Sequence, residues 1–300
     1  MRRLLRIAVF VALLTPVARS SAQPAPARVT ILYDAIGKST PLKHGWGYSA
    51  LIEYGGRRIL FDTGGRVDDF ASNVNALGVD LGRLDFVVLS HRHGDHTSGL
   101  NHVLKVNPRV TIYTPAEQQN FHTPSAPALV NLIRRRVETA PEDMHYFDGK
   151  VPPQIGSDSP WPDANFVQIR TPTEVFPGFW LFSTVSEVTG TKEMNEVSLA
   201  LKTPQGLVVV VGCSHPGVEK ILEAATKIEP RVYSIFGGFH LVDVPDPEVT
   251  SLVTRFRDKW KFQRVAAGHC SGEFAFSEFN RVYGPRYDRA VVGAVFELPR

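Results

Sequence analysis

Residues 90–96 read Ser-His-Arg-His-Gly-Asp-His and directly follow the apolar stretch 86–89. A short apolar run of this kind predicts a buried strand, so the polar segment begins where that strand ends. His91 and His93, two positions apart, leave the chain on the same side, whereas Asp95 and His96 lie beyond the bend at Gly94 and point elsewhere. This spacing suits two neighbouring metal ions better than one.

The residue types in this segment indicate which metal ions fit. Neutral imidazole and carboxylate groups suit zinc, iron or manganese, and a site poor in thiolate is more often catalytic than structural. The alternatives are a closed structural zinc site and a polar loop whose histidines have no common role. We expect two divalent ions, with zinc favoured and iron or manganese as alternatives.

The segment resembles the HxHxDH signature of the metallo-β-lactamase fold superfamily. Upstream, residues 49–53 and 58–64 are similar to the paired strands and the "LFDTG" turn that precede this signature, and residues 97–100 are similar to the start of the helix that follows it. The resemblance implies an α/β fold, an αββα sandwich of two stacked mixed β-sheets flanked by helices.

The first 22 residues have the pattern of a secretory signal peptide. Arg2, Arg3 and Arg6 precede an apolar run from Ile7 to Leu14, and small residues follow at 20–22. That run is short for a membrane span, so no stable membrane anchor is expected. The sequence therefore predicts a periplasmic or secreted protein whose domain spans residues 23–300.

The charge balance gives no argument for a nucleic-acid partner. The chain has 33 basic and 30 acidic side chains, and four of the basic ones lie in residues 1–22, which contain no acid, so the remainder has a net charge of −1. We interpret the triplet 134–136, three arginines, as a solvated helix face. A small-molecule substrate is the expected partner, and the sequence predicts no oligomeric state.

Predicted strands and helices alternate, which is typical of the α/β class. The expected strands are 29–33, 48–54, 57–61, 84–89, 109–113, 179–183, 197–201, 207–211, 232–236 and 264–267. The expected helices are 67–77, 103–106, 128–137, 216–226 and 247–260. Frequent Pro, Asp and Ser weaken the pattern in residues 114–177, which we interpret as an insertion that covers the active site or as a surface excursion without a role.

Three further histidines follow predicted strands in the second half of the chain. His215, His240 and His269 come after 207–211, 232–236 and 264–267, and loops at strand ends are where functional groups gather in layered α/β folds. The surrounding Gly-Cys-Ser-His-Pro-Gly, Gly-Gly-Phe-His-Leu and Gly-His-Cys-Ser-Gly motifs resemble the branch named for 7,8-dihydropterin-6-yl-methyl-4-(β-D-ribofuranosyl)aminobenzene 5'-phosphate synthase.

By position, this resemblance implies two sets of metal ligands. The first set is His91, His93 and His215. The second set is Asp95, His96 and His269. The superfamily's Gly-His-Thr-Pro-Gly loop and later bridging aspartate are absent, and Cys213 stands where that aspartate normally follows a glycine.

The remaining candidates have roles that the sequence leaves open. Cys213 is a possible metal ligand or redox group, and Cys213 and Cys270 form a disulfide, or one is a ligand, or both are buried thiols. His240 donates a proton or binds substrate, or it is structural. Asp62 supports the site, since a metal-bound imidazole usually donates its other N–H to a carboxylate or carbonyl. His44 lines the cleft or, as we favour, packs internally.

These residues together predict a secreted metal-dependent hydrolase. Its substrate is a phosphoester, a lactone or another ester, with Asp95 as a ligand that orients the nucleophile and His240 as the proton donor. The branch name implies a dihydropterin aminobenzene-phosphate synthase-like activity, and the export signal argues against that cytosolic pathway. The alternatives are a β-lactamase and a non-catalytic metal-binding sensor or solute-binding protein.

Overall fold

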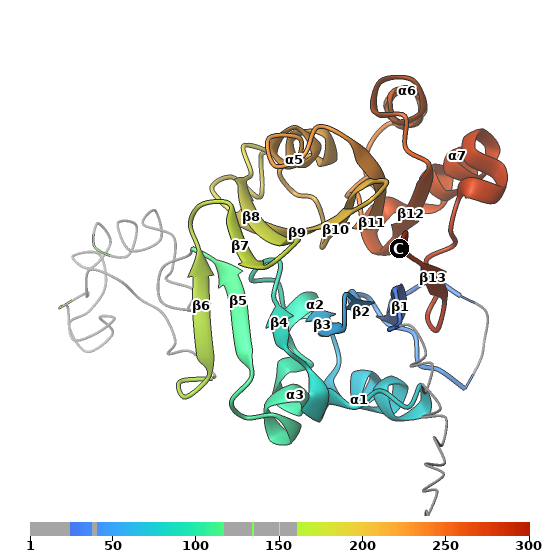
Figure 1. The fold of residues 1–300 in the computed structure, drawn as a ribbon. Helices are drawn as coiled ribbons and strands as arrows, with labels where there is room; N and C mark the ends of the chain where they lie inside the picture. The colour runs from blue at the N-terminus through green and yellow to red at the C-terminus, as the bar shows by residue number, and fades with distance from the viewer. Residues whose placement is uncertain (1–24, 38–40, 117–133, 135–149, 151–160) are drawn as a thin grey trace, which may run out of the picture.

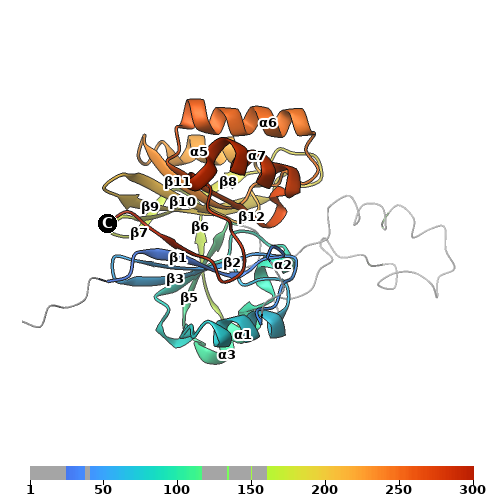
Figure 2. The same cartoon turned by 90° about the vertical axis from the view of Figure 1, so that its right-hand side faces the viewer.

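Two β-sheets face each other in the middle of the protein, and helices cover the outer face of each (Figures 1 and 2). The computed structural model describes residues 25–37, 41–116, 134, 150 and 161–300. The predicted signal peptide, most of the predicted helix 128–137, His122 and His145 lie outside these residues. The α/β class and the αββα arrangement are confirmed.

The first sheet has seven strands, antiparallel at one side and parallel at the other. In spatial order these are β13 (Val295–Glu297), β1 (Arg28–Tyr33), β2 (Ser49–Tyr54), β3 (Arg57–Phe61), β4 (Phe86–Val88), β5 (Thr111–Pro115) and β6 (Asn165–Ile169). Its outer face is covered by α1 (Val67–Ala76) and α3 (Leu100–Val106), with the short helices η1 (Leu81–Arg83) and α2 (Gly94–Thr97) in the connections.

The second sheet has six strands. In spatial order these are β12 (Arg264–Gly268), β11 (Val232–Gly238), β10 (Gly206–Val211), β9 (Asn195–Thr203), β8 (Phe179–Val185) and β7 (Thr173–Phe176). Its outer face is covered by α5 (Val218–Ala225), α6 (Asp246–Arg255) and α7 (Glu273–Tyr283), and shorter helical turns are η5 (Phe256–Trp260), η6 (His269–Ser271) and η7 (Gly284–Arg286). Every residue of β10 is buried between neighbours on both sides, as its uniformly apolar sequence predicts.

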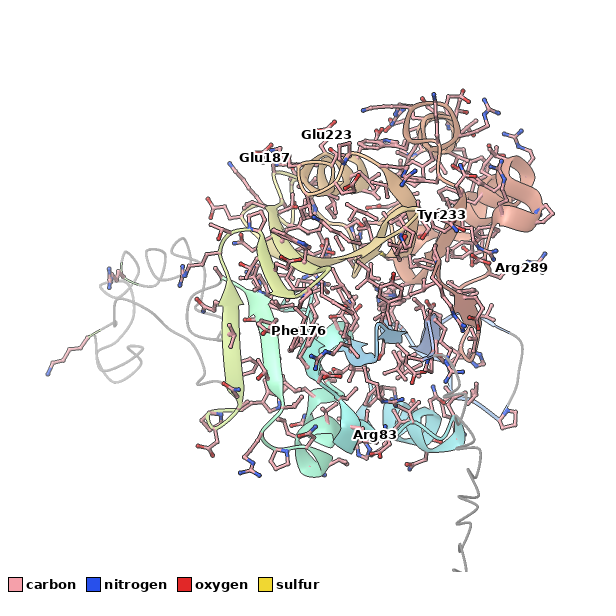
Figure 3. The ribbon with its side chains drawn as sticks, viewed as in Figure 1. Arg83, Phe176, Glu187, Glu223, Tyr233 and Arg289 are labelled. Carbon is pink, nitrogen blue, oxygen red and sulfur yellow. The ribbon has the colours of Figure 1, made fainter. Side chains whose placement is uncertain are left out.

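The main apolar core lies between the two sheets. Phe176 of β7, labelled in Figure 3, stacks on Phe86 of β4 with ring centroids 5.7 Å apart, so it joins one sheet to the other. Two further apolar clusters fill the spaces between each sheet and its helices. Since burial of apolar area is the dominant favourable term in folding, this layering fixes the sheets against each other.

The predicted insertion 114–177 is wrong at its carboxyl end. Residues 165–169 form β6, which pairs in parallel with β5, and residues 173–176 form β7 at the edge of the other sheet. Both are edge strands with partly exposed residues, so they lack the apolar run that marks a buried strand. Helix α7 and the three-residue strand β13 are also absent from the elements predicted from the sequence.

No helix in the described part of the chain has the length and apolar character that a membrane crossing requires.

Candidate metal centre

Every predicted ligand lies in a loop or short turn at the carboxyl end of a strand. His91, His93, Asp95 and His96 follow β4, while His215 follows β10 and His269 follows β12. Because β10, β11 and β12 are parallel neighbours, their following loops meet at one edge of the second sheet. The edge of the first sheet that carries residues 90–96 faces it.

One ligand group combines His91, His93 and His215. Their candidate ligand atoms lie within 4.8 Å of one another, and the three ring centroids are 4.6 to 4.9 Å apart. His91 is fully buried, and its Nε2 has no hydrogen-bond partner among the described residues. A buried ring nitrogen without a partner is costly, and a metal ion at this position would satisfy it.

The second ligand group combines Asp95, His96 and His269. The Nε2 atoms of His96 and His269 are 3.2 Å apart, and Oδ2 of Asp95 lies 3.5 Å from the first and 3.4 Å from the second. Two imidazole nitrogens and a carboxylate oxygen that converge in this way match the ligands that divalent transition metals prefer. The structure therefore brings all six predicted ligands into two adjacent groups.

Asp62 and Ser90 fix the orientation of two of these imidazoles. The carboxylate of Asp62 accepts hydrogen bonds from Nδ1 of His96 at 2.7 Å and from Oγ of Ser90 at 2.7 Å. Because the Ser90 hydroxyl donates its one proton to Asp62, it accepts from Nδ1 of His91, 2.8 Å away. Both imidazoles thus carry their hydrogen on Nδ1 and turn Nε2 towards the ligand groups.

Glu196 has the same function for His215, and the sequence analysis missed it. This buried β9 residue accepts hydrogen bonds from the backbone N–H groups of Cys213, Ser214 and His215 and from Nδ1 of His215. Burial raises its pKa, but the His215 contact and the backbone donors outweigh this and lower the pKa below its usual value. The sequence does contain one indication of this role, since Glu196 is an acidic residue directly before the apolar stretch 197–201.

Asp34 and Trp46 are further residues that the sequence analysis missed. Oδ2 of the buried Asp34 accepts the backbone N–H of His269 at 2.9 Å, and burial raises the pKa of Asp34 to about 8. The Trp46 ring lies 5.0 Å from the His269 ring and is 55% exposed, so it borders the ligand groups on the solvent side. His44, two residues before Trp46, packs near Gly37. His102 of α3 contacts Phe70 and lies outside the site.

The two cysteines are both buried and free, so the disulfide alternative is wrong for this structure. Sγ of Cys213 is 3.2 Å from Nε2 of His96 and falls within 4.8 Å of the ligand atoms of His91 and His96. Burial, together with the neighbouring Cys270, raises the pKa of the Cys213 thiol. Cys213 therefore lies within ligand reach of the histidines, beside a second thiol.

His240 belongs to neither of the two predicted ligand groups. Its ring centroid is 4.6 Å from that of His215, and its ligand atom lies within 4.8 Å of the sulfur atoms of Cys213 and Cys270. A hydrogen bond with Cys270 raises the pKa of this half-buried imidazole above its usual value. The position next to His215 and the raised pKa suit a proton donor at the edge of the site.

Backbone strain is concentrated at the site. Asp62, Ser214, His240 and His269 have φ angles of 55°, 64°, 50° and 46°, which side-chain-bearing residues adopt only rarely. Such conformations cost free energy and persist where the surrounding contacts impose them, as they often do at functional sites.

The model of the "Metallo-beta-lactamase superfamily" matches residues 46–179, a span that holds residues 90–96 but not His215, His240 or His269. A protein of Methanocaldococcus jannaschii named "7,8-dihydropterin-6-methyl-4-(beta-D-ribofuranosyl)-aminobenzene-5'-phosphate synthase" is 26% identical, with 90% of this chain and 95% of that protein covered.

Solved structures share the fold. The crystal structure of Tm1679, described as a metal-dependent hydrolase of the beta-lactamase superfamily, has a TM-score of 0.67 at 23% identity and covers 91% of this chain and 99% of its own. The zinc-bound PqqB from Methylobacterium extorquens has a TM-score of 0.52 at 14% identity, with coverage of 90% and 100%. At these identities the structures establish the fold alone.

Proposed function

We propose that this chain, an enzyme of the metallo-beta-lactamase superfamily, hydrolyses an ester bond in a phosphoester, a lactone or another ester with two divalent metal ions. The observation that carries the proposal is the pair of adjacent three-residue ligand groups, one centred on His91 and one on His96. The group of Asp95 is partly open, since the Asp95 side chain is 23% exposed. Catalytic metal sites keep such an open position, whereas structural sites are closed.

The residues fit zinc, with iron or manganese as alternatives. The first group offers three imidazoles, and the second offers a carboxylate with two imidazoles, with the Cys213 thiol beside them. These are borderline ligands, and the zinc-bound relative of the same fold supports the choice of zinc. When bound, such ions lower the pKa of a water molecule towards neutrality and polarise the bond under attack.

The chain's own residues complete the reaction. Asp95, within 3.5 Å of both Nε2 atoms in its group, accepts a hydrogen bond from the attacking water and so orients it. Hydrolysis joins the water oxygen to the acyl carbon or phosphorus, breaks the bond to the leaving oxygen and requires a proton on that oxygen. His240, beside His215 and with its raised pKa, supplies this proton.

A synthase activity is the second candidate. The relative from Methanocaldococcus jannaschii bears a synthase name and matches nine tenths of this chain, which supports a related reaction on a pterin and an aminobenzene ribofuranosyl phosphate. Against it stands the signal-like sequence of residues 1–22, because an exported enzyme would not meet cytosolic pterin intermediates. We propose export on that sequence, and amino-terminal sequencing of the protein recovered from a cell fraction outside the cytoplasm tests it.

The hydrolase proposal is tested with the purified protein. We expect about two metal ions per chain and turnover of at least one substrate in a panel of phosphodiesters, lactones, p-nitrophenyl esters and β-lactams. His96→Ala should lose most of that turnover, while His102→Ala, a histidine outside the site, should keep it. Bound metal without any turnover sensitive to His96→Ala would contradict the proposal and favour a sensor or solute-binding protein.

A further inference from the structure

A cavity of about 430 Å³ adjoins the ligand groups on the side of His215 and His240. It lies between the loop 186–194, the start of α5 and the segment 239–245 that leads into α6. Cavities of roughly 300–1,000 Å³ are typical of small-molecule sites. Because two residues of the centre line this cavity, a substrate whose reacting bond lies at the metals can extend into it.

Most of the lining surface of the cavity is apolar. Val218 of α5, Leu241 and Leu252 of α6 line it and are 4%, 8% and 7% exposed. The buried Phe239 adds to this lining, and Val188, Val244 and Pro245 lie nearer to solvent. The contribution of such surfaces to binding comes from the removal of apolar area from water. They favour a hydrocarbon substituent over a polar one.

The charged groups of the cavity do not provide an anion site. Lys220 is paired with Glu187, 3.1 Å away, and Glu219 is paired with Arg255, 2.7 Å away. The charges of Lys220 and Glu219 are therefore each largely neutralised by their own partners.

Asp243 and Glu248 remain at the rim. Both are exposed, and neither carboxylate forms an ion pair with any residue that the structure describes. A distal phosphate or carboxylate that reaches the rim would therefore meet negative charge, whereas the positive charge of His240 and of the proposed metal ions lies at the end of the cavity next to the ligand groups.

Exposed apolar side chains continue from the cavity around the metal centre. Val188 and Val242 are 50% and 52% exposed, and Trp46 is 55% exposed beside His269. Val242 is held to the site loop by its backbone N–H, which donates to the carbonyl of Cys270 at 3.2 Å. Exposed apolar residues on three loops that border one centre indicate a binding surface rather than scattered exposure.

We propose that the cavity binds an apolar substituent without negative charge, so that the substrate is an ester or lactone with a hydrocarbon chain. This inference rests on the proposed hydrolase function and narrows its substrate class. It disfavours substrates whose distal group is a phosphate or a carboxylate.

The first test compares p-nitrophenyl esters of increasing chain length on the metal-loaded enzyme. We expect kcat/KM to rise by up to about fourfold for each methylene buried, and a terminal carboxylate on the chain to abolish the gain. Val188→Ser should reduce the increase of kcat/KM with chain length. The double variant Asp243→Asn, Glu248→Gln should raise kcat/KM for the ester whose chain ends in a carboxylate. Val106→Ser, a matched exposed valine on α3, is the control and should change neither.

A second measurement separates this inference from the hydrolase proposal. Hydroxamates bind divalent metals without turnover, so calorimetry compares acetohydroxamate with octanohydroxamate on the zinc-loaded protein. We expect octanohydroxamate to bind more tightly than acetohydroxamate and Val188→Ser to remove this difference. That result supports the cavity assignment even if no ester is hydrolysed. Ester hydrolysis with no effect of chain length, together with equal affinities for the two hydroxamates, would overturn it.

Discussion

His96 donates its Nδ1 hydrogen to Oδ2 of Asp62 across 2.7 Å, and neither side chain is exposed to solvent. Asp62 follows β3 and His96 lies in α2, so parallel pairing of β3 with β4 brings the two residues together. The bond fixes the tautomer of His96 and leaves Nε2 for the group that includes Asp95 and His269. Asp62 is thus the main support of the second ligand group.

Asp62→Asn should weaken metal binding at the group of Asp95, His96 and His269. An amide holds the imidazole less firmly than a carboxylate, and loss of such a support usually costs about 10- to 100-fold in metal affinity. Titration against a competing chelator measures the change. Asp85→Asn, which alters a carboxylate paired with Arg57 at 2.6 Å away from the site, is the control. Equal affinities in Asp62→Asn and the unmodified protein would contradict the prediction.

Metal binding at the two groups should differ in pH dependence. Burial lowers the pKa of His93 to about 4, so His93 carries no proton to be displaced at neutral pH. Burial also lowers the pKa of His96, but the charge and hydrogen bond of Asp62 outweigh this and raise it to about 9. A metal that displaces this proton gains up to about tenfold in affinity per pH unit below that pKa.

Chelator titrations at several pH values should therefore show that affinity rises more steeply with pH for one of the two ions, the ion held by the group of His96, than for the other. His96→Ala should remove the steep component. Identical slopes for the two ions would show that proton release from His96 does not govern the second group.

Cys213 should be a metal ligand, and Cys270 should not. Sγ of Cys213 lies within 4.8 Å of the ligand atoms of His91 and His96, whereas Cys270 joins no group with these histidines among the described residues. In the cobalt(II)-substituted protein we expect near-ultraviolet thiolate-to-metal absorption that Cys213→Ser abolishes and Cys270→Ser retains. The opposite pattern, or absorption that survives in Cys213→Ser, would exclude Cys213 as a ligand.

Glu196→Gln should destabilise the protein. The carboxylate accepts three backbone N–H groups of the loop 213–215, and an amide would turn its own N–H₂ against at least one of these donors. Because buried hydrogen bonds to charged groups contribute about 1.5–3 kcal/mol each, we expect a loss of about 2–4 kcal/mol in the free energy of unfolding. Glu223→Gln, an exposed α5 residue, is the control for denaturant unfolding.

The same variant gives a pH test. The folded-state pKa of Glu196 is below its usual 4.5, so its contribution to stability is fully present above about 4.5 and is lost as the pH falls through the lower, folded value. The difference in stability between the unmodified protein and Glu196→Gln should shrink in acid below that range. A difference that stays constant would assign the effect to packing rather than to charge.

Much of the first half of the site could be predicted from the sequence. The spacing of His91 and His93 after an apolar strand is a local pattern, and strand geometry alone turns both side chains the same way. The strand-end positions of His215 and His269 identified them for the same reason. The edge strands β6, β7 and β13 were not predicted from the sequence, because partly exposed or three-residue strands have no clear apolar pattern.

Asp62 was predicted as a supporting residue, but Asp34 and Trp46 could not be, because their partners are distant in sequence. Asp34 accepts the backbone N–H of His269, 235 positions away, and Trp46 lies against the same imidazole. Nothing in the neighbourhood of either residue in the sequence marks this contact. Only the packing of one sheet against the other brings them to the site.

The sequence by itself determined the ligand types, their placement at strand ends and the layered α/β class, because these depend on local periodicity and on the chemistry of single residues. The tertiary structure alone decided the distances that bring the two sets of three ligands together, that the cysteines are free thiols beside them, and that a largely apolar cavity with acidic residues at its rim opens next to His240. These features depend on distances between segments far apart in the chain. Such distances are fixed only when the apolar faces of the two sheets pack together.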